Sequence, residues 1–383
     1  MAYPVVAIID EGLILSKFQD SKVREIDIYE SDDAVPVDLT SADDKRLHGT
    51  NIASLIFQVC PAADVLSIRM IPVGQINISL LCKALRFCAT QDHIRIINIS
   101  LGILANENPS QELLESCEAC FRKGQLLLAA AHFNSEKPCY PAAYPFVYGV
   151  GVGMLKDVRR YAYVGEGYIN ILAKGIHQRL LHEAGRHILR GGTSYATAAF
   201  SGILCERLLQ EPAATNAELH QKIQLGSTDA FSLHYNCLSQ PDAYTDDDKA
   251  FSIDNTWKIM TYAIDPATVP ERSIPKEQLL YNMSYFMPGN KQATTYPGVP
   301  IIRPILSPGI FGRVNTLLLG NFLSDPMLLN VYFGHSLIHY FIKHNGNFVV
   351  FDAYIASVIR KSVRLTDASF TGQIVFLETS YNC

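Results

Sequence analysis

The segment Val5-Val6-Ala7-Ile8-Ile9-Asp10-Glu11-Gly12 is an apolar run that ends at an aspartate and a glycine. Such a run is typical of a buried strand in a parallel sheet, because both faces of that sheet are covered. Open α/β sheets gather their ligands and catalytic groups at the carboxyl ends of the strands, where Asp10 lies. The segment therefore predicts an α/β fold and makes Asp10 a candidate site residue, although an aspartate that only caps a turn has the same pattern.

Apolar runs and helix-period segments alternate from this strand to about residue 210. Four further apolar runs predict strands at residues 65–70, 94–99, 126–131 and 147–152. Helical spacing of apolar residues predicts helices at 48–58, 79–88, 111–123, 194–209 and 216–223. Because helices separate continuous apolar strands, we expect a mostly parallel sheet that is covered on both faces.

The sequence changes character after a polar, acidic stretch at residues 239–249. This composition is typical of a linker or a surface loop. We therefore predict a first domain over residues 1–240 and a second region over residues 250–383. In the second region, clusters of proline and glycine separate apolar runs at 317–319 and 348–351. This pattern indicates an α/β or α+β fold.

Composition and charge exclude several classes of protein. Of the 383 residues, 48% are hydrophobic and 18% are charged, which is typical of a folded globular protein. Lys and Arg number 32 against 37 Asp and Glu, so nucleic acid is not an expected partner. No apolar run approaches the roughly 18 residues of a membrane-spanning helix, so no membrane partner is expected either. The oligomeric state is left open.

The cysteines and the amino terminus bear on the cellular compartment. The nine cysteines lie mostly in apolar surroundings, which favours reduced thiols over a disulfide framework. The residues that precede Asp10 lack the features of a secretory signal, so we expect a cytoplasmic protein. Cys117 and Cys120 have the spacing of half a zinc or redox site. Since no second pair lies at zinc spacing, we interpret them as packing residues of the helix at 111–123.

Two further segments place polar side chains at the ends of predicted elements. His48 begins the helix at 48–58, where a neutral imidazole can face a carboxylate with one nitrogen and a nucleophile with the other. Ser194 follows a glycine turn and opens the helix at 194–209. A serine there either only caps the helix or acts as a nucleophile beside the positive helix end. Aspartate, histidine and serine in this chain order match the order of the subtilisin type of triad.

The three segments resemble the signature blocks of the subtilisin-like serine proteases. The matching stretches are Ile8-Ile9-Asp10-Glu11-Gly12, His48-Gly49-Thr50 and Gly192-Thr193-Ser194-Tyr195-Ala196. Intermediate segments at 61–66, 97–102, 140–145 and 150–152 agree with the family in order and spacing. The resemblance covers residues 3 to about 210. It implies the subtilisin-like three-layer α/β fold with a mostly parallel sheet.

The resemblance also implies a mechanism. His48 would take the proton of Ser194, and Asp10 would orient the ring and stabilise the imidazolium. Ser194 would then attack a peptide carbonyl to form an acyl-enzyme, which water hydrolyses. The substrate would lie as an extended strand against Ser100-Leu101-Gly102.

The oxyanion donor is the main departure from the family pattern. The family supplies this hydrogen bond from an asparagine that follows an Ala-Ala-Gly turn, whereas this chain reads Ala129-Ala130-Ala131-His132-Phe133-Asn134. Strict register would place Phe133 at the donor position, and phenylalanine cannot donate. A one-residue insertion brings in Asn134, which we predict as the catalytic donor. His132 remains the alternative.

The second region holds two weaker signals. Residues 307–316 have the glycines of a phosphate-binding loop, but the spacing differs and the lysine is absent, which favours a turn before the run at 317–319. His335, His339 and His344 lie in an apolar segment without a nearby Glu or Cys, which favours packing or surface positions. The family also needs no metal, so neither a cofactor nor a metal is expected.

The sequence thus predicts an intracellular serine endopeptidase. Family members made for export carry an inhibitory prodomain before the aspartate strand, whereas only nine residues precede Asp10 here. If the chain is translated as it stands, we expect its choice of substrate to restrain it, which favours a dedicated peptide or protein substrate such as a peptide precursor. Substrate recognition is one role open to residues 250–383. The alternative is a pseudo-enzyme of the same fold that binds peptides as a partner or scaffold. The intact triad argues against this alternative, and the unassigned oxyanion donor argues for it.

Overall fold

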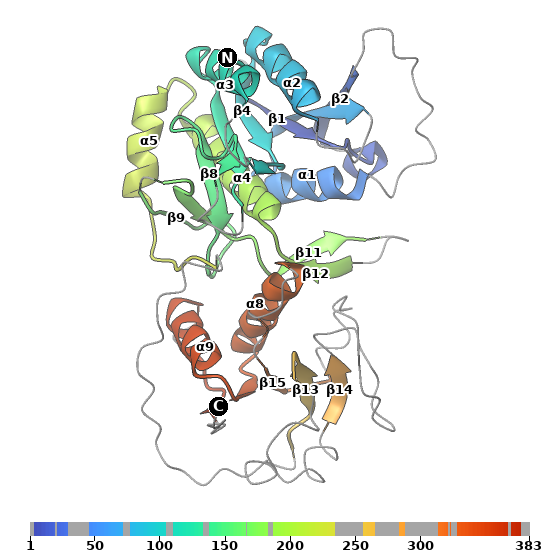
Figure 1. Ribbon diagram of the computed structural model, residues 1–383, viewed down its shortest axis with the longest axis vertical. Coiled ribbons are helices and arrows are strands. Elements are labelled where there is room, and N and C mark those ends of the chain that lie inside the picture. Colours follow the sequence, from blue (N-terminus) through green and yellow to red (C-terminus); the bar gives the residue numbers. More distant parts are fainter. Residues whose placement is uncertain are drawn as a thin grey trace. The chain divides into compact units, whose positions relative to one another are not determined.

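A computed structural model provides the structure of the chain (Figure 1). It describes residues 4–19, 21–29, 46–71, 77–104, 110–132, 138–165, 167–182, 187–233, 256–264, 283–287, 313–320, 322, 328–366 and 369–376. The chain divides into two units. Unit 1 comprises Met1–Gly175, Leu181–Gly185 and Gly192–Cys237, and unit 2 comprises Ile176–Leu180, Arg186–Gly191 and Leu238–Cys383. The acidic stretch at 239–249 lies outside the described residues.

An eight-stranded sheet forms the middle layer of unit 1, with the strand order β2-β3-β1-β4-β6-β8-β10-β9. Its strands are β1 (Val5–Asp10), β2 (Lys22–Tyr29), β3 (Asp64–Ile71), β4 (Ile94–Ile99), β6 (Leu126–Ala130), β8 (Tyr148–Val152), β9 (Tyr161–Tyr163) and β10 (Ile171–Ala173). Every pairing is parallel except that of β9 with β10. The predicted α/β fold with a mostly parallel sheet is confirmed.

Helices cover both faces of this sheet (Figure 1). On one face α2 (Ile78–Thr90) packs against α3 (Gln111–Arg122), and on the other α1 (Leu47–Val59) packs against α4 (Thr193–Gln210). The predicted helix near 216–223 is α5 (Asn216–Leu225). None of the helices in the described part of the chain is both long and apolar enough to cross a membrane.

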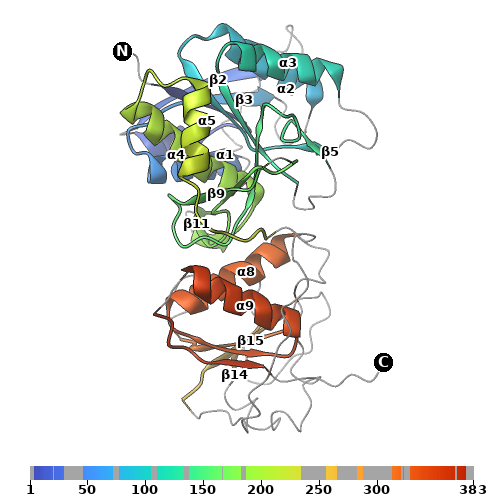
Figure 2. The same cartoon turned by 90° about the vertical axis from the view of Figure 1, so that its left-hand side faces the viewer.

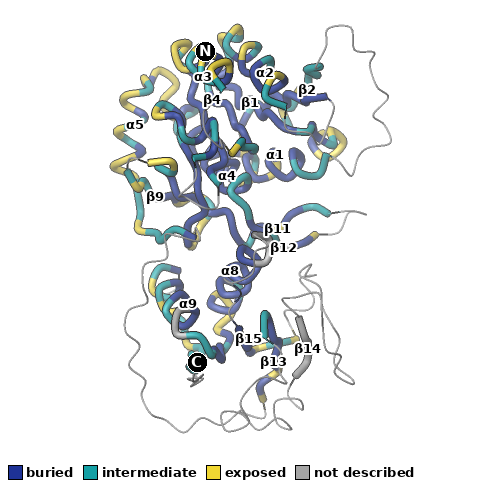
Figure 3. Tube along the Cα trace, in the orientation of Figure 1, coloured by how far each residue is buried: buried dark blue, intermediate teal, exposed yellow. Residues whose placement is uncertain are grey.

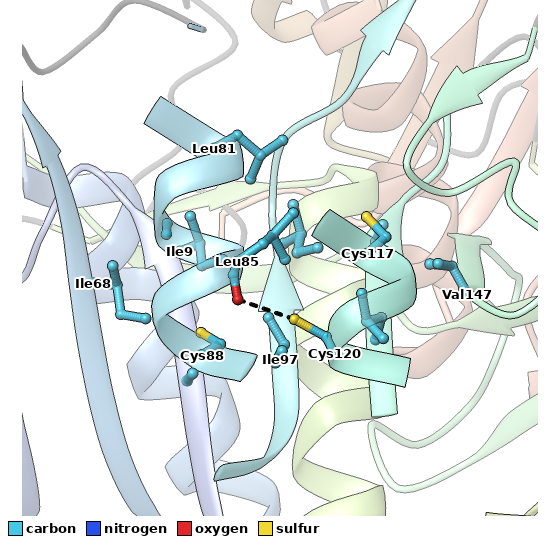
Figure 4. Close-up of a cluster of buried hydrophobic side chains, with 14 of the residues drawn as sticks. Ile9, Ile68, Leu81, Leu85, Cys88, Ile97, Cys117, Cys120 and Val147 are labelled. Carbon is cyan, nitrogen blue, oxygen red and sulfur yellow. Dashed lines mark hydrogen bonds between the residues drawn. The ribbon is translucent and has the colours of Figure 1, made fainter. Parts of the chain in front are cut away.

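Apolar side chains fill the space between the sheet and the pair α2 and α3 (Figure 4). Ile9 and Ile97 reach this core from the sheet, and Leu85 reaches it from α2. Cys117 and Cys120 are fully buried in the same core, and the Cys120 thiol donates a 3.1 Å hydrogen bond to the Leu85 carbonyl. Burial raises the pKa of Cys120 to about 12, so this thiol stays protonated at neutral pH. Both cysteines pack in the core, as predicted.

The helix α4 is buried along most of its length (Figure 3). All residues from 195 to 205 are buried. A side chain at Gly202 would place its Cβ only 2.7 Å from the Cβ of Val59 on α1, so glycine allows the two helices to approach closely. This packing matters for the site because α1 carries His48 and α4 carries Ser194.

Unit 2 contains a second sheet, of five strands, in the order β14-β13-β15-β16-β17. The strands are β13 (Ile259–Tyr262), β14 (Met283–Met287), β15 (Thr316–Leu319), β16 (Asn347–Val350) and β17 (Ile374–Phe376), and all pairings are parallel. Numbered along the chain, this is the 2-1-3-4-5 order of flavodoxin-like sheets. The helices α8 (Leu328–Lys343) and α9 (Ala353–Thr366) lie side by side on one face (Figure 2). Of the two fold classes considered for this region, the structure has the α/β class.

Unit 2 also includes a hairpin whose sequence lies between β10 and α4. The strands β11 (Gln178–Leu181) and β12 (His187–Arg190) form a two-stranded sheet, and most of it belongs to unit 2. Just before β11, the amide of His177 donates a 2.9 Å hydrogen bond to Ser336 Oγ on α8, and the His177 ring stacks on Tyr340. Unit 2 is therefore built partly from residues that precede Ser194 in the chain.

Candidate active site

Asp10, His48 and Ser194 each lie at the end of an element of unit 1. Asp10 is the last residue of β1, and His48 and Ser194 are the second residues of α1 and α4. His48 Nδ1 lies 3.0 Å and 3.1 Å from the two carboxylate oxygens of Asp10. Asp10 is buried, with 6% of its surface exposed, whereas 34% of the His48 side chain is exposed. The structure thus brings the carboxylate and the imidazole together and leaves the ring partly open to solvent.

The electrostatic surroundings of His48 favour its protonated form. Burial of the ring opposes protonation, but the charge of Asp10, the hydrogen bond to Asp10 and the charge of Glu11 together raise the pKa of His48 to about 9. The ring is therefore an imidazolium at neutral pH in the free protein. Because the folded pKa is raised, the stability that this pair contributes is complete below pH ~6.5 and is lost as the pH rises through about 9.

Ser194 lies beside the histidine helix. The ring of Tyr195, the next residue in α4, is 5.8 Å from the His48 ring. The Ser194 hydroxyl donates a 3.0 Å hydrogen bond to the carbonyl of Ser100.

The turn after β1 is held by polar groups of the neighbouring strands. Glu25 Oε2, on β2, accepts hydrogen bonds from the amide of Leu13 (2.7 Å) and the hydroxyl of Ser67 (2.8 Å). Gly12 has a φ of 94°, a conformation that favours glycine. A side chain at Gly12 would also overlap Arg69 of β3. These contacts fix the backbone that immediately follows Asp10.

Ser100-Leu101-Gly102, the predicted substrate-binding segment, lies at the carboxyl end of β4. The Ser100 hydroxyl donates a 2.7 Å hydrogen bond to Asn98 Oδ1, and the Asn98 amide donates a 2.9 Å hydrogen bond to Ser201 Oγ on α4. This buried chain ties β4 to α4 and fixes the carbonyl that accepts from Ser194. Leu101 and Gly102 are half-buried. A role for this segment in peptide binding stays a prediction.

The strand that follows this segment is short and paired. β5 (Ile103–Leu104) pairs antiparallel with β7 (Cys139–Tyr140). A side chain at Gly102 would overlap the Cys139 sulfur, so glycine allows β7 to lie directly against the segment. Burial raises the pKa of Cys139 to about 11, so the sulfur is a neutral thiol at neutral pH.

The predicted oxyanion donor lies outside the described residues. Asn134 and Phe133 belong to the segment 133–137, of which nothing is described. His132, the alternative donor, is described and is half-buried just beyond the end of β6. The assignment of Asn134 therefore stays a prediction that kinetics must test.

We expect Asn134→Leu to lower kcat by about 10²–10³-fold with little change in KM. An oxyanion donor binds mainly the transition state, so its loss affects the chemical step more than substrate binding. Steady-state kinetics on a peptide substrate measures both constants, with His132→Ala as the matched comparison. A normal kcat for Asn134→Leu combined with a collapse of kcat for His132→Ala would move the donor to His132.

The histidines of α8 pack inside unit 2. His335 and His339 are buried, with 0% and 3% of their surfaces exposed. Burial lowers the pKa of His335 to about 3, so its ring is neutral under ordinary conditions. Among the described residues, no group of three or more His, Cys, Asp or Glu side chains could hold a metal ion. The glycine-containing segment 307–316 lies mostly outside the described residues.

Sequence reasoning missed two carboxylates that support the site. Glu25 lies on β2, a strand that the sequence does not predict. Glu11 lies in the signature block around Asp10, but the sequence assigns it no role. The signal for Glu11 was its position between Asp10 and the glycine of the turn. No local signal identifies Glu25, because it reaches the turn only through the pairing of β2 with β3.

The arrangement has the elements of nucleophilic catalysis. A carboxylate holds one nitrogen of an imidazole, and a serine lies at the start of an adjacent helix. These are the residue types that a nucleophile, its base and an orienting group require. The amino-terminal turn of α4 can add main-chain donors, since its N-cap residue Gly192 has no side-chain cap.

Comparisons with known proteins find similar sequences. The profile of the subtilase family matches residues 3–237, which include Asp10, His48 and Ser194. Over 238 residues the chain is 24% identical to subtilisin amylosacchariticus of Bacillus subtilis subsp. amylosacchariticus, covering 58% of this chain and 60% of that protein. Over the same length it is 23% identical to the subtilisin of Bacillus pumilus, covering 58% and 83%. The chain thus spans about three fifths of the length of the first of these relatives.

Solved structures of proteases are also similar to the chain. The S41 psychrophilic protease is 21% identical, with a TM-score of 0.48 over 58% of this chain and 82% of that one. The prenylagaramide maturation protease PagA is 22% identical, with a TM-score of 0.43 over 56% and 80%.

Proposed function

The chain belongs to the subtilase family, and from this premise we propose that it is a serine endopeptidase with Ser194 as its nucleophile. The observation that carries the proposal is the hydrogen bond between His48 and Asp10 beside the first turn of α4. A buried carboxylate that holds an imidazole near a helix-start serine supports acyl transfer by these three residues.

The proposed mechanism assigns one role to each residue. Neutral His48 accepts the proton of the Ser194 hydroxyl through Nε2 while the serine oxygen attacks the peptide carbonyl carbon. Asp10 keeps the proton of the ring on Nδ1 and stabilises the imidazolium that forms. The imidazolium then gives its proton to the leaving amine, which leaves an acyl-enzyme. Water, deprotonated by the same ring, hydrolyses the ester and restores Ser194.

The negative oxygen of the tetrahedral intermediate needs hydrogen-bond donors. The backbone N–H of Ser194 is one, because the amide groups in the first turn of α4 have no partner within the helix. We propose the side-chain amide of Asn134 as the second. Each such donor contributes roughly 2.7–4 kcal/mol to stabilising the transition state.

We further propose that the substrate is a dedicated peptide or protein, such as a peptide precursor, cleaved in the cytoplasm. The cytoplasmic setting is supported by the cysteines, since all seven in the described part of the chain are buried and none is in a disulfide. Unit 2, with its own α/β sheet, is the candidate for substrate recognition. Its strand order resembles that of folds that bind ligands at the carboxyl ends of strands.

A fluorophosphonate probe tests the proposal directly. We expect it to label the folded protein at one residue, Ser194, because phosphonylation requires a serine that a neighbouring base activates. Mass spectrometry of the labelled peptide locates the residue, and heat-denatured protein is the control. A folded protein that binds peptides but neither reacts with the probe nor hydrolyses them would instead be a pseudo-enzyme.

A further inference from the structure

We propose that Glu11 is a positioning residue of the active site, which fixes the backbone at His48 and adds a second negative charge beside the imidazole. This inference rests on the proposed function, in which His48 is the general base. It concerns a residue that follows Asp10 directly and has no other role in the mechanism.

Glu11 binds both members of the His48 and Asp10 pair. Its backbone amide donates a 2.8 Å hydrogen bond to Asp10 Oδ1. Its side-chain oxygen Oε1 accepts a 2.9 Å hydrogen bond from the backbone amide of His48. Glu11 thus binds the Asp10 carboxylate through its backbone and the main chain of His48 through its side chain. Glu11 and His48 are 37 positions apart in the sequence.

The second contact replaces a missing helix cap. The helix α1 begins at Leu47, and its N-cap residue is Arg46, which makes no side-chain cap hydrogen bond. The amides in the first turn of a helix have no partner within it, and a carboxylate is a favourable acceptor at this positive end. Glu11 supplies that carboxylate from another part of the chain, by binding the amide of His48.

The close approach of the turn and the helix depends on glycine. A side chain at Gly49 would overlap the carbonyl oxygen of Gly12, so only glycine lets the helix start lie directly against the turn after β1. The amide of Gly49 also stabilises the charged form of Glu11. The close approach at Gly49 and the hydrogen bond from the His48 amide both place the Glu11 carboxylate at the amino end of α1.

The charges around Glu11 act in opposite directions. The pKa of Glu11 is raised, because burial and the Asp10 charge outweigh the amides of His48 and Gly49 and the charge of His48, which lower it. In return, the Glu11 charge adds to that of Asp10 in raising the pKa of His48. The imidazole of His48 is therefore hydrogen-bonded to one carboxylate, that of Asp10, and also feels the charge of a second, that of Glu11.

Other charged groups near the turn have partners of their own in the described structure. Glu25 of β2 accepts from the amide of Leu13, and Arg69 of β3 binds Asp27 through two hydrogen bonds of 2.8 Å and 2.6 Å. Arg46, which precedes α1, donates to the Leu13 carbonyl. Among the described residues, the carboxylates whose charges raise the pKa of His48 are those of Asp10 and Glu11.

This arrangement predicts the pH dependence of the enzyme. Only neutral imidazole can accept the serine proton, so kcat/KM of the wild type should rise with pH, with a midpoint closer to 9 than to 6.5. Glu11→Gln removes the charge but keeps an oxygen that can accept from the His48 amide. It should lower the midpoint by about one pH unit and leave the alkaline plateau within about twofold of wild type.

The experiment measures kcat/KM from about pH 6 to about pH 10.5 for the wild type, Glu11→Gln and Glu11→Ala. Glu11→Ala also removes the hydrogen bond to His48, so it should lower both the midpoint and the plateau, the latter about tenfold. Glu112→Gln is the matched control, because it makes the same charge change on α3, where Glu112 forms an exposed ion pair with Arg86 of α2. Its profile should coincide with that of the wild type.

Each outcome decides between structural and electrostatic roles. An unchanged midpoint in Glu11→Gln would overturn the electrostatic role, and an unchanged plateau in Glu11→Ala would overturn the positioning role. If Glu11→Ala does not fold, Glu11→Gln still decides the first question, and a lost plateau in a well-folded Glu11→Gln would also contradict the proposal. A wild-type profile without any histidine-dependent rise would instead contradict the proposed function itself.

Discussion

The Ser194→Ala variant should lose about 10⁶-fold in kcat while remaining folded. Without the hydroxyl no acyl-enzyme can form, and the remaining catalysis comes only from substrate binding and the oxyanion donors. The fold should tolerate the change because the Ser194 side chain is half-buried and makes one hydrogen bond, to the Ser100 carbonyl. Loss of such a hydrogen bond changes the free energy of unfolding by only about 1 kcal/mol.

Two measurements separate the loss of chemistry from a loss of structure. Peptide hydrolysis gives kcat, and circular dichroism with thermal unfolding gives the fold and its stability. Ser54→Ala is the matched control, since Ser54 is an exposed residue of α1 whose hydroxyl donates a hydrogen bond to the Thr50 carbonyl one turn earlier. Turnover by Ser194→Ala close to that of wild type would exclude Ser194 as the nucleophile.

The parts of the fold that the sequence predicts are those with a local signal. Continuous apolar runs at β1 and β4 marked buried strands, because both faces of the sheet are covered by helices. Asp10, His48 and Ser194 could be singled out because each lies at the boundary of an apolar element and within a segment that resembles a family signature block. Their catalytic roles stay predictions.

Strand β2 lacked such a signal. Its sequence, Lys-Val-Arg-Glu-Ile-Asp-Ile-Tyr, alternates charged and apolar residues, and most of its side chains are only half-buried. It lies at the edge of the sheet and pairs only with β3, so its place follows from tertiary pairing rather than from local hydrophobicity. Glu25, which binds the turn after Asp10, could not be assigned for this reason.

The basicity of His48 also required the structure. The chain order alone predicts a histidine that titrates in its ordinary range, because sequence shows which residues are present but not how close their charges lie. The Asp10 and Glu11 carboxylates, brought to the ring by β1 and the turn after it, raise the pKa to about 9. The expected pH profile is therefore more alkaline than that of an enzyme whose histidine has an ordinary pKa.

The geometry around Asp10 predicts that Asp10→Asn lowers kcat by about 10⁴-fold. The amide of Glu11 donates to Asp10 Oδ1, so an asparagine should turn its carbonyl oxygen toward Glu11 and its NH₂ group toward His48. That NH₂ group requires an acceptor at Nδ1 and thereby places the ring proton on Nε2. A ring protonated on Nε2 cannot accept the proton of Ser194, which is why the loss appears in kcat rather than in KM.

The same substitution removes the negative charge of Asp10, which lies beside the His48 ring. The midpoint of the kcat/KM profile should therefore move to lower pH, and the alkaline plateau should fall. Asp64→Asn is the control, because it also replaces an aspartate by asparagine. Asp64 is the first residue of β3 and forms a partly exposed ion pair with Arg24. This variant should leave both the midpoint and the plateau unchanged. If Asp10→Asn kept kcat within about tenfold of wild type, the carboxylate would not set the tautomer of His48, and the hydrogen bond between them would be structural only.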